Sequence, residues 1–238
     1  MKRLFAAFER FGVEYLLISG QASILYGAAT FSEDVDIWLG PGAANVRRLV
    51  RSLAACGAKV HKLTPPLEAR WLRRGHGFHF VTPGPVYLDV MAYPPRAGGF
   101  AAAVARAARV ASPWGSVPLV SIEELILLKR TRRLPDYEVI SNLVRIRVDR
   151  EAAPGRALLA WAARTTCRAE DRADYLARLG RPGAVESCRR QIAAEVARMQ
   201  SADARYWSRR VDDLRKLRRR GALLREGMAV RELAGRRP

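Results

Sequence analysis

The chain has few cysteines and no long apolar run. Its three cysteines, Cys56, Cys167 and Cys188, are widely spaced among 238 residues, which excludes a disulfide scaffold and favours a reducing compartment. No apolar segment approaches the roughly 20 residues of a membrane-spanning helix. The first residues mix apolar and charged side chains, which predicts an amphipathic helix rather than a signal peptide. We therefore expect a cytoplasmic protein without membrane contact.

Two kinds of ligand motif are also missing. The sequence contains neither a P-loop nor the glycine fingerprint of dinucleotide-binding proteins. His76 and His79 lie near each other, with Cys56 and His61 further away, but no CxxC or HxxxH pair accompanies them. Zinc binding by these residues is therefore not favoured.

Negative charge is scarce. Lys and Arg number 42 against 23 Asp and Glu, which gives a formal net charge of +19, and the excess is denser after Arg150. Such an excess attracts polyanions such as nucleic acid, triphosphates or an acidic protein. An Arg- and Ala-rich composition is also typical of a GC-rich genome. The charge alone therefore does not choose between a nucleic-acid partner and a solvated basic surface.

The apolar pattern predicts strands and helices first, and helices only afterwards. Helices are expected at 2–11, 21–26, 45–55, 99–108, 122–132, 135–147 and 184–217, and strands at 14–18, 34–39, 58–61, 77–81 and 86–92. Pro83-Gly84-Pro85 predicts a hairpin, and Ser121 and Glu124 have the spacing of a capping box. We expect an α+β domain over residues 1–148 and a basic helical C-terminal domain over residues 149–238.

The strongest local feature is the acidic segment Ser32-Glu33-Asp34-Val35-Asp36-Ile37. Because strand side chains alternate between two faces, Asp34 and Asp36 should share one side while Val35 and Ile37 point into the core. Two carboxylates side by side on an apolar strand repel each other unless a cation neutralises them. The pattern indicates a site for a hard divalent ion such as Mg²⁺, against the alternative of two exposed carboxylates at a strand end.

A third carboxylate, Asp89, interrupts the apolar run Val86-Tyr87-Leu88-Asp89-Val90-Met91, where it has no structural purpose of its own. Three carboxylates on neighbouring strands can hold two cations about 3.5–4 Å apart, the arrangement used for in-line phosphoryl displacement. One ion activates the attacking oxygen, and the other binds the triphosphate. Asp89 is a candidate for holding the activating ion and for accepting the hydroxyl proton.

Ser19-Gly20-Gln21 lies where a strand is expected to pass into a helix. A glycine there lets the backbone approach a phosphate, and a helix N-terminus offers free N–H groups and a favourable dipole. Ser19 adds a hydroxyl donor. The turn is a candidate phosphate-binding loop, although many strand–helix turns contain Ser-Gly.

Gly20, Asp34-Val35-Asp36 and the distant Asp89 together resemble the polymerase-beta-like nucleotidyltransferase superfamily, whose signature is a small-residue turn, an acidic strand end and a third carboxylate. Over about residues 1–148 the chain is most similar to the abortive-infection, type IV toxin branch. The similar segments are Ser19-Gly20-Gln21-Ala22, Leu25-Tyr26-Gly27, Ser32-Glu33-Asp34-Val35-Asp36 and Leu125-Ile126-Leu127-Leu128-Lys129-Arg130. The resemblance implies a nucleotidyltransferase-type mixed sheet flanked by helices, followed by the all-helical region.

The resemblance also implies an activity, the transfer of an NMP from an NTP such as ATP to an acceptor hydroxyl with release of pyrophosphate. Asp34, Asp36 and Asp89 would be the catalytic residues and would hold two Mg²⁺ ions, with Mn²⁺ as an alternative. The implied nucleotide-binding residues are Ser19, Gly20, Gln21, Ser32, Lys129 and Arg133, with Asp136 nearby. Lys129 as an ordinary surface lysine is the competing interpretation.

The acceptor is left open by the sequence. The positive C-terminal region favours RNA, most of all a tRNA 3′ end, while a protein hydroxyl and an aminoglycoside-like antibiotic are alternatives. A non-catalytic module that binds nucleic acid or a partner on the same fold is the rival class. A cognate toxin or antitoxin partner is a further candidate. Among the tryptophans, Trp71 beside Arg70, Arg73 and Arg74 is the candidate for nucleic-acid contact.

Overall fold

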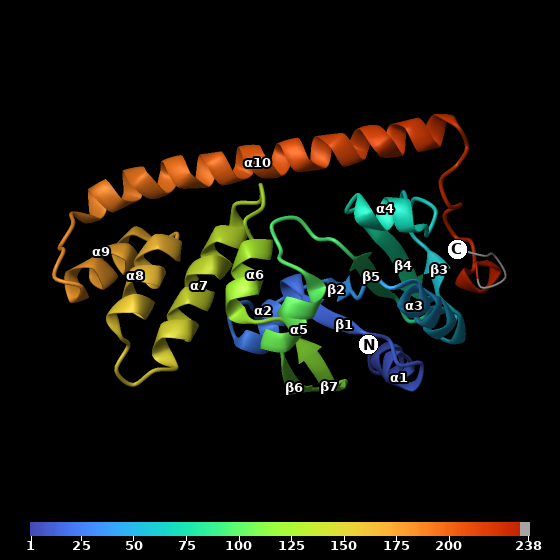
Figure 1. Ribbon diagram of the computed structural model, residues 1–238, viewed down its shortest axis with the longest axis horizontal. Coiled ribbons are helices and arrows are strands. Elements are labelled where there is room, and N and C mark those ends of the chain that lie inside the picture. Colours follow the sequence, from blue (N-terminus) through green and yellow to red (C-terminus); the bar gives the residue numbers. More distant parts are fainter. Residues whose placement is uncertain (234–238) are drawn as a thin grey trace.

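The computed structural model describes residues 1–233, whose strands form one seven-stranded mixed sheet flanked by helices (Figure 1). The strands are β1 (Tyr15–Ile18), β2 (Asp34–Leu39), β3 (Lys59–Val60), β4 (Phe78–Thr82), β5 (Val86–Met91), β6 (Ala108–Ser112) and β7 (Gly115–Leu119). The helices are α1 (Lys2–Arg10), α2 (Ser19–Tyr26), α3 (Ala43–Ala55), α4 (Ala69–Arg73), α5 (Phe100–Arg106), α6 (Ile122–Leu128), α7 (Pro135–Asp149), α8 (Arg156–Thr165), α9 (Ala169–Arg178) and α10 (Val185–Arg219), with a 3-10 helix η1 (Val230–Glu232). The expected α+β class is confirmed. Only helices follow the last strand, as expected, except where the chain returns to the edge of the sheet after α10.

The order of the strands brings remote parts of the sequence together. The sheet runs β3-β4-β5-β2-β1-β7-β6. β2 lies between β5, with which it is parallel, and β1, with which it is antiparallel. In this register Asp36 is the partner of Asp89 on one side and of Ile18 on the other. The predicted hairpin between β4 and β5 is confirmed by their antiparallel pairing.

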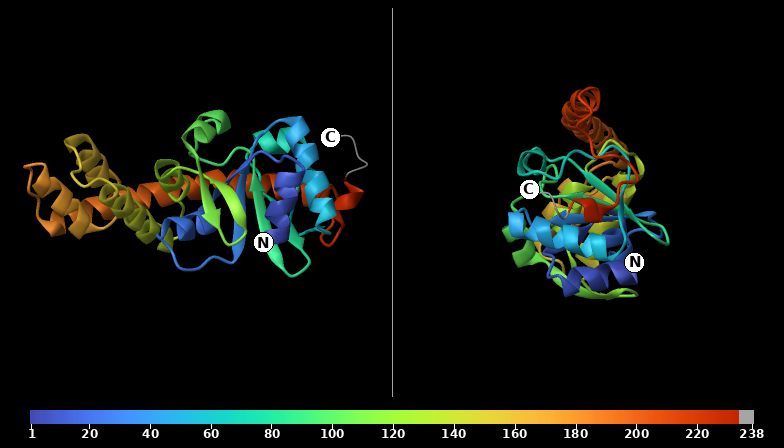
Figure 2. Two further views of the ribbon diagram at one scale, coloured as in Figure 1. Left: turned by 90° about the horizontal axis from the view of Figure 1, so that it is seen from below. Right: turned by 90° about the vertical axis from the view of Figure 1, so that its right-hand side faces the viewer.

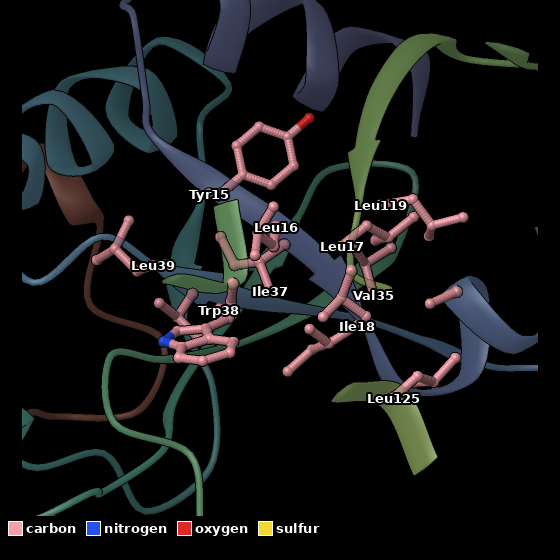
Figure 3. Packing of buried hydrophobic residues seen from close by; sticks show 14 of the residues in the cluster. Tyr15, Leu16, Leu17, Ile18, Val35, Ile37, Trp38, Leu39, Leu119 and Leu125 are labelled. Atoms are coloured by element: carbon pink, nitrogen blue, oxygen red, sulfur yellow. The ribbon is translucent and has the colours of Figure 1, made fainter. Parts of the chain in front are cut away.

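The central strands carry the core (Figure 3). All four residues of β1 are buried, and on β2 Val35 and Ile37 are fully buried while Asp34 and Asp36 stay partly exposed. The predicted alternation along β2 is therefore confirmed. Full burial of a large apolar side chain stabilises a fold by about 1.5–3 kcal/mol. The apolar face of β2 thus fixes the strand that presents both carboxylates on its other face.

The hairpin of β6 and β7 and the short helix α4 were not expected from the sequence. β6 is an edge strand whose residues are all exposed or half-buried, so it lacks the apolar alternation that marks a strand. α6 ends at Leu128, earlier than expected. The capping box is only half formed: Ser121 accepts from the Glu124 N–H, but the Glu124 carboxylate bonds to Gly98 and Arg106 instead.

The long helix predicted near the C-terminus is α10, which has 35 residues and is about 52 Å long at 1.5 Å per residue. It runs along one side of the molecule, from α9 past α7 to α4 (Figures 1 and 2). Beyond it the chain returns to the sheet, where Ala229 pairs with Lys59 and Leu224 with Thr64. The division at residue 148 stays a prediction.

None of the helices in residues 1–233 has both the length and the apolarity needed to cross a membrane.

Candidate functional site

A cavity of about 570 Å³ opens at the acidic end of β2 and β5, in the size range of small-molecule sites. It receives side chains from the β1–α2 turn, the loop before β2, the segment after α6, and α10. Its lining residues are Ser19, Gly20, Ala29, Phe31, Ser32, Glu33, Asp34, Asp36, Asp89, Lys129, Thr131, Arg132, Arg133, Pro135, Asp136, Val139, Asp203 and Trp207. The cavity therefore brings together all of the sequence-predicted site residues except Gln21.

Asp36 and Asp89 form the acidic centre of this cavity. They are register partners on the parallel strands β2 and β5, so their carboxylates lie on the same face of the sheet. Burial, and next the charge of Asp89, raises the pKa of Asp36 to about 7, with a smaller contribution from Asp34. A hydrogen bond from Ser19 and the charge of Lys129 act in the opposite direction. The site favours a proton or a cation beside Asp36.

His79 is a neighbour of this centre that the sequence did not assign to it. Its Nδ1 lies 2.7 Å from Asp89 Oδ1, and because the carboxylate can only accept, Nδ1–H is the donor. A Cβ on Gly77 would come within 3.1 Å of the imidazole ring, so glycine leaves room for it. Within residues 1–233, no group of three or more His, Cys, Asp or Glu side chains is placed to hold a metal ion. In this arrangement Asp89 engages His79.

The turn between β1 and α2 is shaped by close approach to the loop before β2. Ser19 has a positive φ of 58°, a conformation rarely taken by residues other than glycine. A Cβ on Gly20 would lie 2.1 Å from Ser32 Oγ, so only glycine fits there. Gln21 is buried and does not line the cavity; its Nε2 donates to the Ser32 carbonyl at 3.1 Å. Gln21 therefore supports the wall, while Ser19, Gly20 and Ser32 form it.

A buried ion pair forms the opposite wall. Lys129 Nζ lies 2.9 Å from Asp136 Oδ1, and both side chains are almost fully buried. Arg133 and Thr131 also donate to the Asp136 carboxylate. Burial pushes the pKa of Asp136 upward, but Lys129 and these hydrogen bonds outweigh it and lower the pKa. Lys129 is thus not an ordinary surface lysine, because its ammonium is fixed inside the cavity wall.

α10 contributes Asp203 and Trp207, two cavity residues that the sequence did not assign to the site. Asp203 is 1% exposed and accepts from Arg96 Nη1 at 2.8 Å and from the Arg132 N–H at 3.1 Å. Trp207 follows one turn later and also lines the cavity. The sequence pattern that could have indicated these two residues is an Asp one turn before a Trp within an Arg-rich helix. That pattern predicts a place in the cavity only when it is known which face of α10 packs on the rest of the chain.

Trp71, the residue singled out for nucleic-acid contact, is a packing residue. Its side chain is 7% exposed and packs edge-on against His76. The guanidinium groups of Arg70 and Arg74 lie over its ring at 5.1 and 5.6 Å from the centroid. The indole is therefore not free to stack on a base.

Comparisons with known proteins give fold-level likenesses only. No protein-family model matches the chain, and no curated protein matches it. Among solved structures it is similar to the lincosamide antibiotic adenylyltransferase LnuA bound to lincomycin, with 19% identity, a TM-score of 0.44, and coverage of 61% of this chain and 96% of that one. It is also similar to a putative nucleotidyltransferase from H. pylori, with 11% identity, a TM-score of 0.41 and coverage of 86% and 95%.

A third similar structure is ANT(2")-Ia in complex with adenylyl-2"-tobramycin, with 15% identity, a TM-score of 0.37 and coverage of 81% of this chain and 94% of that one. At these identities and scores the likenesses do not assign an activity to this chain. The function has to be inferred from the site.

Proposed function

We propose that this chain is a metal-dependent nucleotidyltransferase that moves an NMP from an NTP to an acceptor hydroxyl. The observation that carries the proposal is the pair Asp36 and Asp89, held side by side in a nucleotide-sized cavity whose opposite wall contains a buried Lys129. An acid whose pKa is raised to about 7 by burial and by a second carboxylate is typical of a functional site rather than of a packing residue. The cavity joins that acidic centre to fixed cationic groups.

The chemistry of the donor set fits Mg²⁺ or Mn²⁺, because Asp34, Asp36 and Asp89 offer only carboxylate oxygens and a cation relieves the repulsion that raises the pKa of Asp36. These three residues would hold two ions, and because no three such side chains of residues 1–233 are now placed around one point, ion binding would require the carboxylates to reorient. When bound, such ions stabilise charge on the triphosphate and lower the pKa of the acceptor hydroxyl.

The remaining roles fall to the residues around the carboxylates. Ser19, Gly20 and Ser32 would bind phosphate oxygens at the start of α2, where free N–H groups lie. Lys129 and Arg133 would balance the negative charge of the triphosphate. In the transfer, the acceptor oxygen bonds to the α-phosphorus as the bond to the β-phosphate oxygen breaks, and pyrophosphate leaves. The hydroxyl proton passes to the Asp89 carboxylate, which His79 orients.

For the acceptor we favour RNA, above all a tRNA 3′ end, in the cytoplasm. The support is the net charge of +19 together with α10, a helix rich in exposed arginines that forms one side of the cavity. A role in abortive infection, with a cognate toxin or antitoxin as partner, belongs to the same proposal and rests on the sequence resemblance. Protein and antibiotic acceptors are the alternatives.

The test is incubation of the purified chain with each α-³²P-labelled NTP, Mg²⁺ and total cellular RNA, beside the variant Asp34→Ala/Asp36→Ala. We expect label in a tRNA-sized band with the native chain and none with the variant. Label on protein would keep the chemistry and change the acceptor. Absence of both labelling and NTP binding would refute the enzyme and favour the binding module.

A further inference from the structure

A second cavity, of about 240 Å³, lies under α10 on the side of α7, α8 and α9. It is lined by Arg130, Ile140, Arg164, Thr165, Cys167, Glu195, Arg198 and Met199. We propose that this cavity binds a backbone phosphate of the nucleic-acid acceptor. The inference rests on the proposed function for the identity of the acceptor strand, but the site itself is argued from its own charges.

The second cavity has an excess of unpaired positive charge. Arg130, Arg164 and Arg198 converge on the cavity, and across residues 1–233 none of the three makes an ion pair or a side-chain hydrogen bond. On α10 itself, Arg189, Arg190 and Arg215 pair with carboxylates. Three guanidinium groups around one small cavity repel each other, and an anion placed between them removes that repulsion. The donor geometry of guanidinium suits phosphate oxygens, which it can bind in bidentate fashion.

The other residues that line this cavity supply no free anionic group. Glu195 is its one acidic lining residue, and both of its oxygens are taken by Arg172, at 3.1 and 2.7 Å. Burial raises the pKa of the Cys167 thiol to about 11, so that group is neutral at physiological pH. The cavity lining therefore keeps an excess of positive charge, and Arg164 and Arg198 are exposed and accessible to a ligand.

The second cavity adjoins the first along the chain. Arg130 lies between Lys129 and Thr131, which both line the first cavity, so one short stretch of chain forms a wall of both cavities. Both cavities also receive side chains from α10, which contributes Glu195, Arg198 and Met199 to the second and Asp203 and Trp207 to the first. Arg198 and Trp207 are separated by about 13 Å along the helix axis.

These positions favour a strand of nucleic acid over an isolated anion. A strand whose reacting end enters the first cavity would pass along α10 and place a phosphate near the second a few nucleotides away. Beyond Arg198 the same helix carries further exposed arginines, among them Arg205 and Arg209. Phosphate contacts of this kind position a strand without reading its sequence.

The experiment measures RNA binding by the full chain directly, without requiring catalysis. A 5′-fluorescein-labelled single-stranded RNA is titrated by fluorescence anisotropy over a series of salt concentrations. The test variant is Arg164→Gln/Arg198→Gln, which leaves the wall shared with the first cavity intact. The matched control is Arg47→Gln/Arg51→Gln, which removes the same charge from two exposed residues of α3.

We expect the test variant to bind roughly tenfold or more weakly, since charge-assisted hydrogen bonds are lost. Its slope of log K against log salt should be shallower by about 0.7, the value for the loss of one phosphate contact on a single strand. The control should retain the native slope. Equal slopes in test variant and control would overturn the proposal. The proposal would also be overturned if the test variant lost the binding of a phosphorylated peptide but kept the native binding of RNA.

The two proposals can fail separately. If RNA binding depends on Arg164 and Arg198 but no labelled nucleotide is ever incorporated, the phosphate site stands and the transferase does not. If incorporation into RNA occurs and the test variant has the native KM for RNA, the transferase stands and the phosphate site is refuted.

Discussion

The two cavities under α10 differ in the sign and the pairing of the charges that line them. The first contains six acidic residues and three basic ones, and its charges are mostly paired or crowded, as in Lys129 with Asp136 and Asp36 with Asp89. The second contains three arginines without partners and one glutamate that is already engaged. An acidic cavity with fixed cations suits a metal-bound triphosphate, while a small cavity of free arginines suits a phosphate that arrives with its own charge.

The comparison shows how one basic helix can serve two different sites. α10 turns Asp203 and Trp207 to the first cavity and Arg198 to the second, although these residues differ by at most nine positions. Net charge alone would describe α10 as a uniform basic surface. The side chains that it faces, rather than its own composition, decide what each turn can bind.

The largest effect should come from Asp89→Asn. The substitution keeps the shape of the side chain and an acceptor for His79, but removes the charge and the proton-accepting group. We expect NMP incorporation to fall on the order of 10³-fold. The measurement is the initial rate of label incorporation from α-³²P-NTP.

The anisotropy titration separates the two cavities in the same variant. RNA affinity and its salt slope should stay native in Asp89→Asn, the reverse of what is expected for Arg164→Gln/Arg198→Gln. A parallel loss of RNA binding in Asp89→Asn would show that the cavities do not act independently.

A smaller effect, on stability, is expected from Lys129→Met. The substitution leaves the Asp136 carboxylate buried without its ammonium partner, and breaking a buried pair in this way costs about 3–5 kcal/mol. Arg133 and Thr131 still donate to Asp136, so the loss should lie at the lower end of that range. Urea denaturation measures the free energy of unfolding.

The double variant Lys129→Met/Asp136→Leu is the control for that measurement. Because it removes the stranded charge as well, it should recover part of the lost stability. Equal stabilities of the single and double variants would mean that the pair itself is not what holds this wall.

The smallest effect is expected on the anchoring of α10 beside the first cavity. His76 is 1% exposed, and its Nε2 lies 3.2 Å from Asp213 Oδ2 on α10. Burial lowers the pKa of His76, the hydrogen bond and charge of Asp213 raise it by less, and Arg210 and Arg74 lower it further. The fold therefore favours the neutral imidazole, and its protonation costs stability.

The sign of the pH effect follows from that pKa. The stability contribution is complete above the ordinary pKa of histidine, about 6.5, and is lost as the pH falls below it. We expect the Tm of the native chain to fall more than that of His76→Gln between pH about 7.5 and pH about 5.5. Hydrogen exchange should locate the loss at α4 and the facing turns of α10. Parallel Tm curves for the two proteins would contradict this account.

Much of the candidate site could be predicted from the sequence because its residues belong to short local patterns. Asp34 and Asp36 follow from the alternation of a strand, and Gly20 from the strand–helix turn. Asp89 stands out as a charge in an apolar run. The structure places all four in one cavity. Their roles in catalysis and nucleotide binding stay predictions, as does the part of Gln21, which supports the wall from behind.

Other features could not be predicted because they depend on contacts between distant segments. His79 reaches the site because its register places it opposite Asp89. The β6–β7 hairpin is recognised only from its place at the edge of the sheet. Lys129 looks the same in the sequence whether it is solvated or buried against Asp136. The role of such a residue can be assigned only when the residue that it contacts in the folded chain is known.

By itself the sequence determined the α+β class, the acidic strand end, the long basic helix and the large net charge, because these follow from local periodicity and composition. Only the tertiary structure decided that Asp36 and Asp89 are neighbours, that α10 passes over both cavities, and that Arg130, Arg164 and Arg198 meet without a carboxylate. The physical reason is that burial and Coulomb interactions act over a few ångströms in space. Strand order and helix packing, rather than distance along the chain, decide which side chains come that close.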